Sequence, residues 1–115
     1  MPVRSLSSSV LVWPDASTVI AAVRQWASEI RCLEGVVRIG YFGSYARGDW
    51  GVGSDLDLIV IVECTGEPFE RRAWRWDLNG LPVPADLLVY TRSEWDSLAA
   101  TRFGQTLERE AVWVL

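Results

Sequence analysis

The sequence predicts a small α/β or α+β domain in which helices cover a mixed β-sheet of three to five strands. Apolar residues between positions 15 and 32 recur at the spacing of one helical face. Residues 36–42, 55–62 and 83–90 are rich in the β-branched and aromatic residues typical of strands. Because 115 residues support one two-layer core, we expect a single domain that covers residues 1–115, with the strand order left open.

The first half of the chain predicts a helix, a strand and a central strand in that order. Asp15 can cap the helix by accepting a hydrogen bond from its free N–H groups, and Gly35 can end the segment. Residues 36–42 form the first strand, which runs into Gly43-Ser44 and a short helix. Residues 55–62 are apolar on both faces after the first turn, which favours a central position in the sheet.

The second half predicts a short helix, a third strand, a longer helix and a final strand. Pro68 is suited to the start of a helix that extends to about residue 76. The third strand, residues 83–90, contains Asp86. Ser93 begins a sequence that resembles a capping box, from which a helix is expected to run to about Phe103. Residues 112–115 are expected to form a last short strand.

Two residue types are absent, and their absence excludes several kinds of chemistry. The chain has no histidine and no lysine, so all 11 basic residues are arginine. This excludes Ser-His-Asp and Cys-His nucleophile systems, histidine-ligated zinc, the P-loop lysine and Schiff-base catalysis. Carboxylates, hydroxyls, backbone amides and arginine remain, and these groups serve in the chemistry of hard metal ions and phosphates.

Net charge and cysteine content bear on nucleic-acid binding and on the cellular location. A net charge of −4 without a basic stripe argues against direct binding of nucleic acid. Cys32 and Cys64 form no CxxC motif, and we expect both thiols to be reduced. No segment resembles a signal peptide or a membrane span, so a cytoplasmic location is expected.

Three aspartates predict a metal site. Residues two apart in a strand share one face, so Asp55 and Asp57 project together about 6–7 Å apart. Two like charges repel unless a divalent cation lies between them, although a solvated strand end is the alternative explanation. Asp86 interrupts an otherwise apolar strand, which is costly unless the carboxylate is paired or ligated. Together the three could hold a pair of Mg²⁺ ions for an in-line displacement at phosphorus.

The turn after the first strand predicts a phosphate site. Gly43 allows close approach of backbone amides to an anion, and Ser44 adds an amide and a hydroxyl at the start of a short helix. Arg47 lies one turn further on and can clamp phosphate oxygens with its planar guanidinium. Glycine-serine turns are common and usually structural. The prediction of a phosphate site therefore depends on the aspartates, which are separated from Ser44 by ten residues.

The stretch Gly43-Ser44-Tyr45-Ala46-Arg47-Gly48, followed by Ser54-Asp55-Leu56-Asp57 and then Asp86, resembles the signature of the DNA polymerase β-like nucleotidyltransferase superfamily. The small size makes the chain most similar to the minimal nucleotidyltransferase (MNT) antitoxins of HEPN/MNT pairs. The resemblance implies the nucleotidyltransferase fold and the transfer of AMP from ATP to a hydroxyl, with release of pyrophosphate. The precedent for the acceptor is a tyrosine on the HEPN ribonuclease toxin.

The resemblance also assigns roles to the matching residues. Gly43, Ser44, Arg47 and Ser54 would bind the nucleotide. Three carboxylates would ligate the metal ions and act in catalysis, those of Asp55, Asp57 and Asp86. Two Mg²⁺ ions, ATP and a HEPN toxin would be the cofactor, substrate and partner.

Two other functions stay open. One is an antitoxin that neutralises its HEPN partner by binding alone, without catalysis. The other is a nucleotidyltransferase that acts on a small molecule, although relatives of that kind carry an additional domain. Homo-oligomers and hetero-oligomers with the toxin are both compatible with the sequence.

Two further groups of residues invite interpretation. Trp50 lies in a glycine-rich loop with little core to enter, so we expect it to border the nucleotide pocket or a partner surface. Arg71, Arg72 and Arg75 are expected to form a solvated helix face paired with Glu67 and Glu70. A contact with an acidic partner or with the triphosphate is the alternative for these arginines.

Overall fold

A computed structural model describes residues 13–33 and 35–115. In this part of the chain, four strands form one mixed sheet in the order β3-β2-β1-β4. The strands are β1 (Val36–Phe42), β2 (Leu56–Val62), β3 (Ala85–Thr91) and β4 (Val112–Trp113). β2 is parallel to β3, whereas β1 is antiparallel to both β2 and β4. The predicted small mixed sheet is confirmed, and its order is now known.

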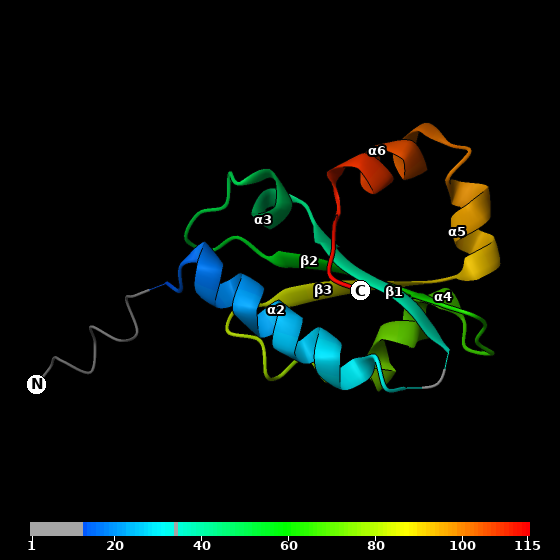
Figure 1. Ribbon diagram of the computed structural model, residues 1–115, viewed down its shortest axis with the longest axis horizontal. Helices are drawn as coiled ribbons and strands as arrows, with labels where there is room; N and C mark the ends of the chain where they lie inside the picture. Colours follow the sequence, from blue (N-terminus) through cyan, green and yellow to red (C-terminus); the bar gives the residue numbers. More distant parts are fainter. Residues whose placement is uncertain (1–12, 34) are drawn as a thin grey trace, which may run out of the picture.

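One face of the sheet is covered by α2 (Ala16–Ile30), which lies along the strands in Figure 1. Asp15 caps the helix as predicted, since its Oδ1 accepts a hydrogen bond from the Thr18 N–H at 2.8 Å. The buried residues of α2 pack on alternate residues of the two inner strands, among them Leu58 and Val60. This packing forms the larger of two hydrophobic cores.

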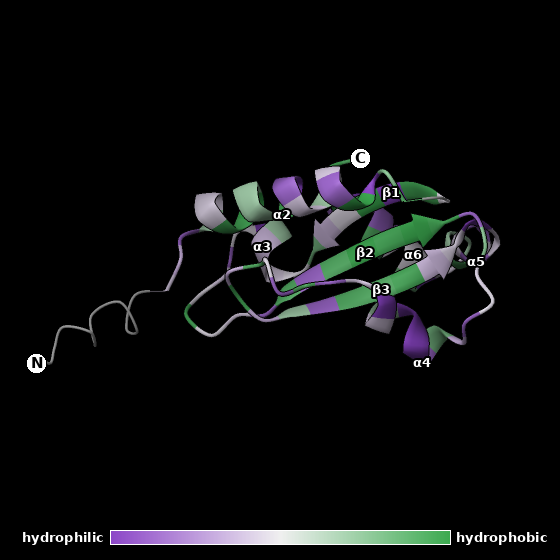
Figure 2. Cartoon of the chain, turned by 90° about the horizontal axis from the view of Figure 1, so that it is seen from below, coloured by the Kyte–Doolittle hydropathy of each residue, from purple (hydrophilic) through white to green (hydrophobic). Residues whose placement is uncertain are grey.

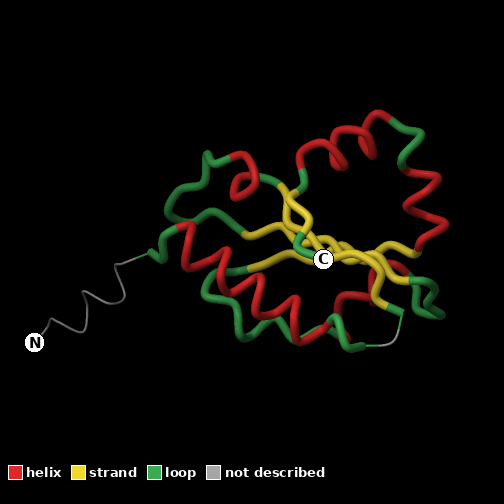
Figure 3. The backbone as a smooth tube through the Cα atoms, viewed as in Figure 1, coloured by secondary structure: helices red, strands yellow, loops and turns green. Residues whose placement is uncertain are grey.

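The opposite face is covered by α5 (Arg92–Leu98) and α6 (Arg102–Glu110), as the tube in Figure 3 shows. Ile59 and Ile61 of β2 are fully or almost fully buried against Trp95 and Leu107 of these helices. Because β2 is buried on both faces, its predicted central position is confirmed.

The helical region after β3 differs from the sequence prediction in two ways. The capping box is formed by Thr91 and Glu94, so the helix begins at Arg92 rather than after a cap at Ser93. The helix also ends at Leu98, and Thr101 caps a separate helix that contains Phe103. Glu94 lies three residues after Thr91, which is the spacing that a capping box requires, so Thr91 rather than Ser93 is the N-cap.

Three short helical segments complete the fold. α3 (Ser44–Arg47) follows β1, while α4 (Phe69–Arg72) and the 3₁₀ helix η1 (Ala73–Arg75) lie between β2 and β3. Throughout residues 13–33 and 35–115, no helix has the length and apolar character needed to cross a bilayer.

The edge strand β4 approaches β1 closely at Gly40. A Cβ atom at this position would lie 2.8 Å from the Trp113 ring, so only glycine leaves room for the indole. Trp113 in turn donates its Nε1–H to Glu108 at 2.7 Å and lies 3.6 Å below the guanidinium of Arg38. These contacts attach α6 and β4 to the middle of the sheet.

Candidate active site

Asp57 and Asp86 are direct neighbours on the two parallel strands. Asp57 of β2 pairs in register with Asp86 of β3, and paired residues of adjacent strands lie on the same face about 5 Å apart. Each is the second residue of its strand, and Figure 2 shows a hydrophilic step near the start of these otherwise apolar strands. Asp57 is half-buried and Asp86 is exposed. Two acidic side chains therefore meet at one end of the sheet.

The electrostatics of Asp57 reflect this crowding. Burial raises the pKa of its carboxyl group above the ordinary value, and the negative charges of Asp86 and Asp55 raise it further. Arg47 acts in the opposite direction and lowers that pKa, while Glu110 raises it. A cation placed among these carboxylates would remove the repulsion, which is the behaviour expected of a metal-binding acidic cluster.

Gly43 places its backbone against the Asp57 carboxylate. β1 and β2 bring Phe42 opposite Asp57, and Gly43 follows with a φ of 75°, a conformation that favours glycine. A Cβ atom on Gly43 would collide with Asp57 Oδ2. Gly43 of the predicted turn therefore lies against Asp57, one member of the predicted pair of Asp55 and Asp57.

Glu110 also belongs to this site, and the sequence analysis missed it. Its Oε1 accepts a hydrogen bond from the Gly43 N–H at 2.9 Å and another from Arg47 Nη1 at 3.1 Å. Arg47 also donates its Nε–H to Asp49 at 3.1 Å. The signal that could have revealed Glu110 is the amphipathic pattern of residues 102–110, which ends on a glutamate just before a strand.

The remaining predicted residues lie around this centre. Ser44 is the first residue of α3 and follows Gly43 directly. Asp55 is exposed and precedes β2 by one residue, in the loop rather than in the predicted strand. Ser54 Oγ accepts a hydrogen bond from the Gly51 N–H at 2.8 Å, which closes the turn before Asp55.

The three aspartates do not form a preassembled metal site. Among residues 13–33 and 35–115, no group of three acidic or cysteine side chains is close enough to hold a metal ion. The negative charges of Asp86 and Asp55 still raise the Asp57 pKa, so the three carboxylates lie near enough to repel one another. Hard oxygen donors on adjacent strands nevertheless suit Mg²⁺, so the residues present fit this ion.

A hollow of about 580 Å³ opens beside Asp57 and Asp86. Apart from the two aspartates its wall is apolar, with contributions from β1, η1, β3 and the segment between η1 and β3. The apolar lining residues are Phe42, Ala73, Trp74, Leu78, Ala85, Leu87 and Leu88.

Trp50 has a core contact, although the sequence indicated little core for it to enter. Its ring stacks on Tyr45 with centroids 5.6 Å apart and planes 8° from parallel. Tyr45 is buried, and its hydroxyl accepts a hydrogen bond from Trp13 Nε1 at 3.1 Å. Trp50 therefore fastens the glycine-rich loop to the main core.

The arginine cluster was also only partly anticipated. Arg72 is buried rather than solvated, and it pairs with Glu94 instead of Glu67 or Glu70 side chains. Its Nη2–H donates to Glu94 Oε2 at 3.1 Å, and its Nε–H donates to the Glu67 carbonyl at 3.0 Å. The arginine thus ties α4 to α5.

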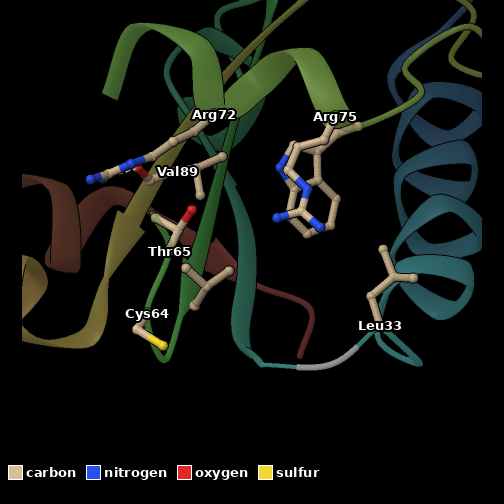
Figure 4. A pocket seen from close by; sticks show the side chains of 8 residues that line it. Leu33, Cys64, Thr65, Arg72, Arg75 and Val89 are labelled. Carbon is tan, nitrogen blue, oxygen red and sulfur yellow. Dashed lines mark hydrogen bonds between the residues drawn. The ribbon is translucent and has the colours of Figure 1, made fainter. Parts of the chain in front are cut away.

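Arg72 and Arg75 line a second cavity of about 270 Å³, shown in Figure 4 with Leu33 facing them across the opening. This cavity reaches Val62, the last residue of β2, whereas the acidic pair lies at the start of that strand. Arg72 is held by the Val89 carbonyl and by Glu94, so its guanidinium is engaged away from the acidic pair.

Comparisons with known proteins identify the family of the chain. A protein from Sulfolobus solfataricus, assigned as a nucleotidyltransferase, has a similar crystal structure with a TM-score of 0.62 and 16% sequence identity, over 98% of this chain and 89% of that one. A toxin-antitoxin crystal structure with AMP-PNP matches with a TM-score of 0.46 and 17% identity, over 89% of this chain and 73% of that one. A search among curated proteins finds no match. The sequence profile described as "Nucleotidyltransferase domain" matches residues 23–112, and the chain belongs to this nucleotidyltransferase domain family.

Proposed function

We propose that the protein transfers AMP from ATP to a hydroxyl group of a partner protein, with Mg²⁺ as the cofactor and a HEPN toxin as the partner. The observation that carries the proposal is the in-register pair of Asp57 and Asp86 next to the Gly43 backbone. A nucleotidyltransferase needs carboxylates for metal ions and a backbone turn for the triphosphate, and these two features are adjacent here.

The proposed roles follow the positions of the side chains. Asp57 and Asp86 hold metal ions from adjacent strands, and Asp55 completes the set when its exposed carboxylate turns inward. Bound Mg²⁺ supplies positive charge that stabilises the attacking and leaving oxygens. Gly43 and Ser44 bind the triphosphate through backbone amides and the serine hydroxyl, and Ser54 contributes from the adjoining loop.

The reaction forms one bond and breaks another at the α-phosphorus. The acceptor hydroxyl oxygen attacks, the bond between the α-phosphorus and the bridging oxygen to the β-phosphate breaks, and pyrophosphate leaves. Asp86 is exposed and accepts the hydroxyl proton. Arg47 is free to turn from Asp49 and Glu110 to the departing phosphates, since both of its ion pairs are at the surface.

The assignment of the partner comes from the motif that spans Gly43 to Asp57, which resembles MNT antitoxins of HEPN/MNT pairs. The reaction consumes ATP, so the proposal places the protein in the cytoplasm.

The decisive experiment incubates the protein with labelled ATP, Mg²⁺ and the product of the adjacent gene. Label should pass to the partner with the parent protein and disappear with Asp55→Asn/Asp57→Asn. Asp96→Asn is the control, because Asp96 is exposed on α5 and lies outside the acidic cluster. Full neutralisation of a toxin by the double variant, with no label transferred by the parent, would show an antitoxin that acts by binding alone.

A further inference from the structure

The cavity of about 270 Å³ in Figure 4 lies outside the proposed chemistry. Among the described residues, none lines both this cavity and the hollow beside the two aspartates. Consecutive residues divide between them, because Ala73 and Trp74 line the hollow whereas Arg75 and Trp76 line the cavity. A ligand in the cavity would therefore leave the hollow open.

Positive charge is the first property that characterises this cavity. None of the described residues that line it is acidic, and two of them are arginines. Arg72 is neutralised by its ion pair with Glu94 and also donates to the Val89 carbonyl at 3.1 Å. Arg75 is exposed and forms no ion pair with any residue of 13–33 or 35–115. Figure 4 shows the two arginine side chains diverging, so Arg75 is the cation available to an anion in the cavity.

Two further hydrogen-bond donors belong to the wall of the cavity. Thr65 Oγ1 accepts a hydrogen bond from the Glu67 N–H at 3.1 Å, which leaves its own O–H free to donate. Trp76 Nε1 is buried without a hydrogen-bond partner, the one side-chain polar atom in this state within the described part of the chain. An unpaired buried N–H is costly, so an acceptor beside it is favoured. Because Nε1 is covered, the indole must turn toward the cavity for a ligand oxygen to reach it.

The size and the apolar part of the lining limit the ligand further. Four side chains contribute apolar surface, those of Leu33, Val62, Trp76 and Val89. A volume of about 270 Å³ corresponds to about nine water molecules in the liquid. It lies just below the range of about 300–1,000 Å³ that is usual for ligand pockets, so we expect a ligand of about ten non-hydrogen atoms with an apolar body. An intact nucleotide is too large to enter.

We propose that this cavity binds a small carboxylate with an apolar body, such as an aryl-substituted short-chain acid. The carboxylate oxygens accept hydrogen bonds from Arg75 and from the Trp76 N–H, while the apolar body packs on Val62 and Val89. A carboxylate suits a single arginine, because the planar guanidinium matches its two oxygens and the two charges cancel. A phosphate dianion would keep one uncompensated charge beside apolar side chains, which is costly.

Titration of the ¹⁵N-labelled protein with 3-phenylpropionate, in the absence of Mg²⁺ and ATP, tests the proposal by NMR. The Trp76 indole signal is identified by its loss in Trp76→Phe, and it should shift saturably with a Kd of about 1 mM, an affinity per atom that small ligands reach. Uncharged 3-phenylpropanamide should bind at least about tenfold more weakly, and inorganic phosphate should cause no saturable shift. Equal binding of the amide, a saturable shift with phosphate, or no shift with 3-phenylpropionate would each overturn the assignment.

Two matched variants test the role of Arg75 in the same titration. Arg75→Gln should weaken the binding of 3-phenylpropionate about tenfold, because it removes the charged donor. Arg71→Gln is the control, since Arg71 is an exposed arginine of α4 that does not line the cavity, and its Kd should stay within about twofold of the parent. Dispersed backbone spectra of both variants show that the fold is retained. Equal losses in the two variants would mean a diffuse attraction by surface charge and would overturn the site, and neither result depends on AMP transfer.

Discussion

The Glu110 carboxylate accepts a hydrogen bond from the Gly43 backbone N–H, with 2.9 Å between Oε1 and the amide nitrogen. The same oxygen accepts a hydrogen bond from Arg47. Glu110, the last residue of α6, thus holds two hydrogen-bond donors that a triphosphate would use in the proposed function. If the proposed function is right, a nucleotide has to displace this carboxylate in order to bind the turn.

Glu110→Ala should therefore bind MgATP more tightly than the parent. Removal of the competing acceptor and its negative charge frees Gly43 and Arg47, and a net hydrogen bond of about 1 kcal/mol corresponds to about a fivefold lower Kd. Isothermal titration calorimetry measures the change, with Glu29→Ala as a control of equal charge on α2. Weaker binding by Glu110→Ala would show that the glutamate holds the turn in its binding form.

Gly43→Ala should abolish metal and nucleotide binding. The added Cβ collides with the Asp57 carboxylate, so either the turn or the aspartate must move. Gly48→Ala is the matched control, because Gly48 also has a positive φ of 86° but open space around its Cα. The control should lose about 1–2 kcal/mol of stability and keep the site. Thermal melts with and without Mg²⁺ and ATP distinguish the two, and equal effects would contradict the close approach.

Asp57→Asn should stabilise the protein in the absence of metal. Burial and the neighbouring charges of Asp86 and Asp55 raise the Asp57 pKa above its ordinary value of 3.8. The cost of the charged form is absent below the unfolded pKa and appears as the pH rises through the raised folded pKa. The variant should thus melt a few degrees higher than the parent at pH 7 and at the same temperature near pH 3. Mg²⁺ should raise the melting temperature of the parent alone, and a lower melting temperature of the variant at pH 7 would refute this explanation.

The Arg72–Glu94 pair predicts an opposite dependence on pH. Hydrogen bonds from the Arg72 side chain and the Thr91 backbone lower the pKa of Glu94 from 4.5 to about 2. The stabilisation is present above pH 4.5 and is lost as the pH falls toward 2. Glu94→Gln should reduce the melting temperature at pH 7 and converge with the parent in acid. Glu70→Gln, on the exposed part of α4, should show little change at either pH.

The sequence predicted the elements whose determinants are local. Asp15 lies at the correct distance from the helix to cap it, and the apolar run after Asp57 required a strand buried on both sides. The aspartates were recognisable because a carboxylate in an apolar strand is costly without a partner or ligand, and the glycine-serine turn was recognisable from its spacing to them. These local patterns were sufficient to predict the mixed sheet and to nominate the acidic cluster.

Features that depend on contacts between distant residues were not predictable. Glu110 reaches Gly43 across 67 positions, and Arg72 reaches Glu94 across 22, so neither pairing has a local pattern. Trp50 was expected to have little core to enter because its loop contains many glycines, but Tyr45 provides a ring on which it stacks. The helix break near Ala99 was also missed; there Thr101 caps a second helix by accepting a hydrogen bond from the Gly104 N–H at 3.1 Å.

The close approach of Trp113 to Gly40 has a consequence for how this sequence can change over evolution. Any side chain at position 40 would push the indole off the sheet, and α6 with Glu110 would move with it, because Glu108 holds the indole nitrogen. The same Cβ would lie 2.9 Å from the Val112 carbonyl oxygen, so a smaller residue at position 113 alone does not make room for it. Relatives that keep β4 paired beside β1 should therefore retain glycine at the position of Gly40, even where the residue at position 113 is small.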